Sequence, residues 1–90
     1  MSETPELLSE TPFEHDGWPF TIRAFKTPEG YTVQSFLRAM PVSHAYMADN
    51  TAYAAQVSAG KDPLALLVQL ARTDLENGLY RQWVLHWAGH

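Results

Sequence analysis

Two turn signals in the first half of the chain favour a β-meander. Asp16-Gly17 tolerates the positive φ angles that a two-residue type I′ hairpin requires. Thr27-Pro28-Glu29-Gly30 places proline and glycine at the second and fourth positions, where a β-turn favours them. Residues 18–25 and 31–40 alternate between apolar and polar side chains, as a strand with one buried face does. We therefore predict three antiparallel strands, the first ending near His15.

The pairing register follows from the same alternation. If Lys26 lies opposite Tyr31, the apolar pairs fall on one side of the sheet: Ala24–Val33, Phe20–Leu37, Trp18–Ala39 and, across the first turn, Phe13–Phe20. A slip of one residue would move these side chains to the other face. Pro19 lacks a backbone N–H, so we expect a bulge or irregular pairing at that position.

Residues 43–60 fit two arrangements. We favour a short strand from His44 to Ala48, followed by a helix that is opened by Asn50 or Thr51 as its cap and closed by Gly60. The alternative is a single helix from Ser43 to Ala59, which the alanine content supports.

The last third of the chain is predicted to be helical. Asp62-Pro63 is a typical helix start, and Asn77-Gly78 a typical end. Residues 79–90 are compatible with a helix, through the four-residue spacing of Leu79, Trp83 and Trp87, or with a strand. We favour the helix.

Strands followed by helices define the α+β class. We expect a three- or four-stranded antiparallel β-meander followed by two or three helices packed on one sheet face, with the Asp62–Asn77 helix covering the face of Trp18, Phe20 and Ile22. Residues 13–90 would form this single domain. Residues 1–12, in which the string Ser-Glu-Thr-Pro occurs twice, are predicted to be a flexible acidic tail.

Composition excludes several classes of function. The 90 residues contain no cysteine, so disulfides and thiolate chemistry are excluded, and a reducing, cytoplasmic location is expected. The N-terminus is acidic rather than signal-like, and the longest apolar stretch, near residues 64–70, is too short to cross a membrane. Residues 1–16 carry five carboxylates and no Lys or Arg, whereas residues 17–90 carry six basic and five acidic side chains. This balance does not favour a nucleic-acid binder.

One candidate interaction surface combines two regions rich in aromatic residues and arginine. The polar face of the sheet is expected to carry Arg23, Phe25, Phe36 and Arg38, and the C-terminal segment carries Tyr80, Trp83 and Trp87. Trp, Tyr and Arg are enriched at binding hot spots, although a small core also uses such rings, and for the C-terminal rings core packing is slightly favoured. The sheet face is expected to be covered by the C-terminal segment, by a second subunit, or by a ligand or nucleic acid.

A candidate pocket is the second site hypothesis. Its lining would comprise His15, which lies beside the Asp16-Gly17 turn, and His44, Tyr46 and Asp49, which lie close together in the middle of the sequence; these residue types can take part in acid–base chemistry. His86 and His90 have the four-residue spacing of metal ligands on a helix, but two ligands do not form a site. No glycine-rich phosphate loop is present. We therefore predict no catalytic, metal or cofactor-binding residues.

These features lead to three ranked hypotheses for function. The first is a non-catalytic accessory or protein-interaction module that forms a homodimer through the candidate interaction surface. The second is a small-molecule-binding protein or minor enzyme that uses the candidate pocket. The third is a weak single-stranded nucleic-acid binder that uses Phe25 and Phe36.

Overall fold

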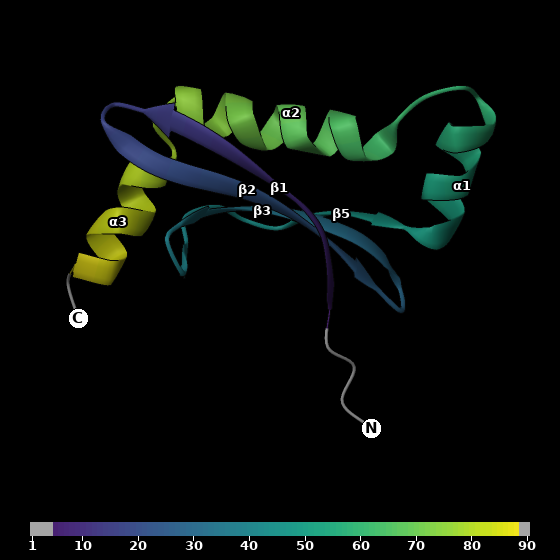
Figure 1. Ribbon diagram of the computed structural model, residues 1–90, viewed down its shortest axis with the longest axis horizontal. Helices are drawn as coiled ribbons and strands as arrows, with labels where there is room; N and C mark the ends of the chain where they lie inside the picture. The colour runs from purple at the N-terminus through teal and green to yellow at the C-terminus, as the bar shows by residue number, and fades with distance from the viewer. Residues whose placement is uncertain (1–4, 89–90) are drawn as a thin grey trace.

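The computed structural model describes residues 5–88 as an antiparallel sheet with helices after it (Figure 1). The strands are β1 (Glu6–His15), β2 (Trp18–Thr27), β3 (Gly30–Leu37), β4 (Met40–Pro41) and β5 (Tyr46–Asp49). The helices are α1 (Asn50–Ser58), α2 (Pro63–Glu76) and α3 (Tyr80–Ala88). Strands β1, β2 and β3 are adjacent in that order, and both β4 and β5 pair with β3. The α+β meander predicted from the sequence is confirmed.

The predicted register is confirmed along most of the sheet. Phe20 pairs with Leu37, Ala24 with Val33 and Lys26 with Tyr31. Phe13 pairs with Phe20 across the first turn. Pro19, however, pairs regularly with Glu14, and the irregularity lies between Leu7 and Ser9 instead. The bulge prediction was wrong because Pro19 lies beyond the β2–β3 ladder, where no hydrogen bond needs its missing N–H.

The first strand begins much earlier than the sequence indicated. Residues 6–12, assigned to a tail, form most of β1 and pair with β2. The strand lies at the edge of the sheet and is exposed on most of its length, so it needs little apolar side-chain surface to form. Pro12 is compatible with such an edge position. The predicted tail at residues 1–4 lies outside the described residues.

A third hairpin, between β3 and β4, interrupts the strand predicted at residues 31–40. β3 ends at Leu37, and Arg38, with a φ of 60°, turns the chain into β4. Trp18 therefore has no pairing with Ala39. The reversal brings Val42 into the core, where its N–H donates to the carbonyl of Ser35. Burial of Val42 offsets the strain of a positive φ at a residue other than glycine.

The structure decides between the alternatives for residues 43–60 and for residues 79–90. Residues 43–60 form the favoured strand and helix, but Asp49 rather than Asn50 or Thr51 caps α1, accepting from the Ala52 N–H at 2.7 Å. The cap of α2 is Asp62, as predicted. Residues 80–88 are helical.

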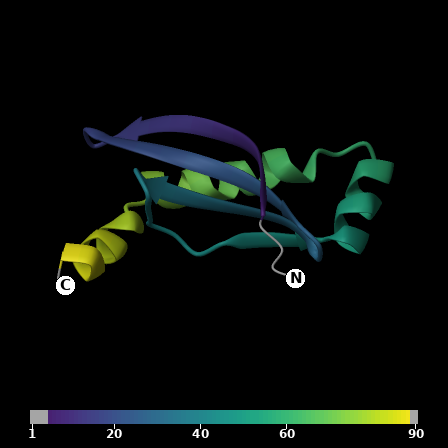
Figure 2. The same ribbon diagram turned by 60° about the horizontal axis from the view of Figure 1, so that its bottom comes forward.

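The core lies between α2 and one face of the sheet, and Figure 2 shows α2 running along that face. Phe20, Ile22, Ala24, Val33 and Leu37 are buried there from β2 and β3. Ala71 and Leu75 of α2 and Tyr80 of α3 complete it. Trp18 was expected in this core but is 43% exposed, because it lies beyond the last β2–β3 pair, Phe20–Leu37.

One buried polar atom leads to a stability prediction. Ser35 is fully buried, and its Oγ has no hydrogen-bond partner among the described residues. The Ser35→Ala substitution should raise the free energy of unfolding by about 1 kcal/mol, because an unsatisfied hydroxyl leaves the core. Urea denaturation would measure the change. Ser43→Ala is the matched control: its Oγ accepts from the Ser35 N–H at 3.0 Å and donates to the His44 carbonyl, so its loss should destabilise the fold. A loss of stability in Ser35→Ala would contradict the prediction.

Candidate functional site

The open face of the sheet is the face opposite α2, and its side chains lie in three rows across the strands. The pairing places Leu7, Phe25, Thr32 and Met47 in the first row. Glu10, Arg23 and Gln34 form the second row. Pro12, Thr21, Phe36 and Pro41 form the third. Two largely apolar rows thus enclose one charged row.

Aromatic and cationic contacts order the centre of the open face. The Phe25 and Phe36 rings meet edge to face, with centroids 6.3 Å apart. The Arg23 guanidinium lies 4.7 Å from the Phe36 ring centroid, and its Nη1 donates to the Arg38 carbonyl at 3.1 Å. Gln34 is held by a bond from its Nε2 to the Ser43 carbonyl at 2.9 Å. The side chains at the centre are therefore positioned before any partner binds.

A shallow hollow of about 290 Å³ lies on this face. Its lining residues are Pro5, Phe25, Thr27, Thr32, Gln34 and Phe36. In Figure 1, α2 lies above the sheet and α1 and α3 lie at its two ends, so that among residues 5–88 no helix covers the open face. The expectation that the C-terminal segment covers it was wrong, because α3 packs at the end of the sheet.

The C-terminal aromatic residues divide between core and surface. Tyr80 is buried against Phe20, with ring centroids 4.7 Å apart. Trp83 packs edge to face on His44, and Trp87 is exposed. The Trp87 Nε1 donates to the Pro41 carbonyl at 2.8 Å. Because Pro41 also pairs with Phe36, Pro41 links the two predicted aromatic regions at this end of the open face.

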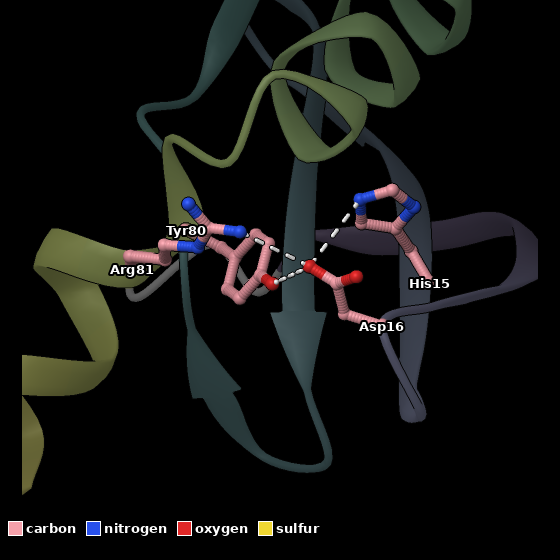
Figure 3. A network of polar contacts seen from close by, with 4 residues as sticks. All are labelled: His15, Asp16, Tyr80 and Arg81. Atoms are coloured by element: carbon pink, nitrogen blue, oxygen red, sulfur yellow. Dashed lines mark hydrogen bonds and ion pairs between the residues drawn. The ribbon is translucent and has the colours of Figure 1, made fainter.

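A polar network fastens α3 to the first hairpin (Figure 3). Asp16, in the turn between β1 and β2, accepts from the Tyr80 hydroxyl at 2.7 Å and from the Arg81 Nη2 at 3.3 Å. The His15 Nε2 lies 3.7 Å from the same carboxylate oxygen. The hydrogen bond from Tyr80, followed by that from Arg81, lowers the pKa of Asp16 below its ordinary value of 3.8. The same contact with Asp16 raises the pKa of Tyr80.

The lowered pKa of Asp16 gives a pH prediction. A carboxyl group whose pKa is lower in the folded state stabilises the fold above its unfolded pKa, and this contribution is lost as the pH falls through its folded pKa. Asp16→Asn should therefore be less stable than the wild type near about pH 7, and the difference should shrink below pH 3.8. Urea denaturation at several pH values measures this. Glu76→Gln, which removes a carboxylate without a hydrogen bond or ion pair among residues 5–88, is the control. An unchanged difference in acid would contradict the prediction.

The four residues of the candidate pocket have different partners. His15 belongs to the Asp16 network, and His44 contacts Trp83. The Tyr46 hydroxyl donates to Asp74 of α2, and Asp49 caps α1. No hydrogen bond, ion pair or ring contact among the described residues joins any two of the four. These contacts give the pocket hypothesis no support.

The part of the chain that the structure describes offers neither a metal site nor a helix that could span a membrane. It contains no group of three or more His, Asp or Glu side chains arranged to hold a metal ion. His90, one member of the spaced histidine pair, lies outside this part. His44 and His86 line a hollow of about 290 Å³ with Gln82 and Trp83. None of the helices in residues 5–88 is both long and apolar enough to cross a bilayer.

Sequence reasoning missed the parts of the open face that lie outside β2 and β3. Leu7, Glu10 and Pro12 were assigned to the tail, and Met47 was not singled out. The alternation of Ser9, Thr11 and Phe13 was an available signal, because threonine and aromatic residues favour strands. The repeated Ser-Glu-Thr-Pro string obscured it.

Comparisons with known proteins add no further assignment: no family model matches the chain, and neither a curated protein nor a solved structure gives a match.

Proposed function

We propose that the chain is a non-catalytic interaction module that forms a homodimer through the open face of its sheet. The observation that carries the proposal is the uncovered pair of apolar rows around Phe25 and Phe36 on a small body. Leu7 is 45% exposed and Met47 is 65% exposed at the two sides of this face. Contiguous exposed apolar patches commonly mark interaction sites.

The size of the face fits a specific dimer. The strands β1 to β5 have 10, 10, 8, 2 and 4 residues, which at about 3.3 Å per residue and about 4.8 Å between strands give a flat area of roughly 540 Å². Specific interfaces begin at about 600 Å² per partner. This area is close to that value and supports burial of the face by a second copy.

Association through the face is favoured over association through the sheet edge. β1 is an edge strand, but its register shift between Leu7 and Ser9 and the missing N–H of Pro12 both interrupt a continuous ladder. Such features discourage pairing with another strand. The open face has no comparable obstacle.

The charges on the face favour a protein partner over nucleic acid. Glu10 and Arg23 are neighbours in the central row, so the row carries both signs. A carboxylate beside the arginine opposes contact with phosphates, whereas in an interface between proteins it offsets the charge of the arginine. The absence of cysteine supports a reducing, cytoplasmic setting for this module.

Sedimentation equilibrium of the full chain tests the proposal. The wild type is expected to be a dimer at micromolar concentrations. Leu7→Glu should raise the dissociation constant by about tenfold or more, because it introduces a carboxylate without a partner into the interface. A strictly monomeric wild type at high micromolar concentration would overturn the proposal.

Leu66→Glu is the matched control. It makes the same chemical change on α2, at a side chain that is 50% exposed, on the opposite side of the molecule. The proposal expects no change in association for this variant. Equal weakening by the two substitutions would place the interface elsewhere.

A further inference from the structure

We infer that the two copies pack face to face with the two-fold axis parallel to the strands and between β2 and β3, so that Arg23 of each copy binds Gln34 of the other. This inference rests on the proposed dimer and adds its geometry. Sheets that pack face to face commonly keep their strands within about 30° of one another. An axis along the strands produces that aligned arrangement.

A second two-fold axis in the plane between the two sheets is geometrically possible, but the residues of the three rows favour the axis along the strands. An axis across the strands, through the central row, would place each strand over its own copy. Glu10 would then oppose Glu10, and Arg23 would oppose Arg23. Like charges facing each other in an interface are unfavourable. An axis along the strands instead places β1 over β5 and β2 over β3.

The apolar rows are also complementary in the chosen arrangement. Leu7 faces Met47 of the other copy, and Phe25 faces Thr32. In the third row, Pro12 faces Pro41, and Thr21 faces Phe36. Each contact occurs twice, as an isologous interface requires.

Arg23 and Gln34 both keep hydrogen-bonding groups that have no partner among residues 5–88 of the single chain, so they can bond to each other across the interface. The bond from the Gln34 Nε2 to the Ser43 carbonyl fixes the amide, and no described residue donates to its Oε1. Arg23 directs one donor to the Arg38 carbonyl and leaves others available. A guanidinium donating to a fixed amide oxygen supplies a charge-assisted hydrogen bond on each side of the axis.

Cross-linking tests this geometry without background, because the chain has no native cysteine. Leu7→Cys and Met47→Cys chains would be prepared separately, mixed, and treated with a bismaleimide that spans about 10 Å, the spacing of packed sheets. The mixture should give a covalent dimer. Leu7→Cys alone should give little, since its two thiols would be roughly 17 Å apart.

Cross-linking and sedimentation together distinguish a wrong axis from a wrong dimer. A sedimentation dimer whose Leu7→Cys chain cross-links with a Pro12→Cys chain rather than with Met47→Cys overturns the axis and leaves the proposed function standing. A dimer that forms none of these cross-links also overturns the axis. A monomer in sedimentation overturns the proposed function, and the geometry with it.

A double-mutant cycle tests the central contact. Arg23→Ala and Gln34→Ala should each weaken the dimer by about tenfold, and the double variant by little more than either one, because both remove the same bond. Additive losses would mean that the two side chains do not meet across the interface. Thr27→Ala, at the margin of the hollow and outside the central row, should not couple to Arg23→Ala.

Discussion

Replacing Phe20 with alanine is expected to lower the free energy of unfolding by about 3–5 kcal/mol, the largest single effect predicted for this chain. Phe20 is 1% exposed, pairs with both Phe13 and Leu37, and packs against the Tyr80 ring. Its removal leaves a cavity where β2, β3 and α3 meet. Proteins of this size are stable by only about 5–13 kcal/mol, so the variant should be close to unfolding at room temperature.

Urea denaturation at one fixed protein concentration measures this loss, because the stability of a dimer depends on concentration. Phe20→Leu is the graded control and should cost less than about 1.5 kcal/mol. Phe36→Ala removes an equal ring from the open face, which is half-buried in the single chain, so its cost should be about half that of Phe20→Ala at a concentration at which the chain is monomeric. Equal losses at Phe20 and Phe36 would contradict the assignment of the core to the α2 face.

Gly30→Ala is expected to destabilise the protein by about 3 kcal/mol, at the upper end of the range for overpacking. Gly30 pairs with Thr27 of β2 and with Asp49 of β5. A Cβ at this position would lie 2.2 Å from the Ala48 carbonyl oxygen and 2.7 Å from the Asp49 Cα. Backbone atoms cannot move aside as a flexible side chain can, so β5 should separate from β3.

Hydrogen exchange would detect this separation as lost protection of the amides in β5. Gly60→Ala is the control, because Gly60 has a positive φ of 78° but no atom within 4 Å of the added Cβ. That variant should cost about 1 kcal/mol from backbone strain alone. Unchanged protection of β5 in Gly30→Ala would contradict the predicted steric conflict.

The meander was predictable because local signals and burial agree there. Asp16-Gly17 and the turn before Gly30 specify where the chain reverses, and the alternation from Phe20 to Ala24 specifies which face is buried. The start of α2 was predictable for a similar reason, since Asp62 and Pro63 act within one helical turn. Such features depend on neighbours in the sequence.

The features that were missed depend on distant parts of the chain. β1 has few apolar residues before Phe13, and it is a strand because β2 offers an edge with which to pair. The turn at Arg38 carries no glycine or asparagine, and burial of Val42 accounts for it. The open face itself required both β1 and β5 to be placed. The central arginine and phenylalanines were found in advance because they lie on predicted strands.

The bond between the Tyr80 hydroxyl and Asp16 joins residues 64 positions apart. While the chain is being synthesised, the first hairpin emerges long before the residue that closes its end. Phe20 therefore stays partly uncovered until Tyr80 has been synthesised and packs against it. A nascent chain would thus expose part of this apolar surface while the residues between the first hairpin and α3 are being made, and transiently exposed apolar surface promotes aggregation.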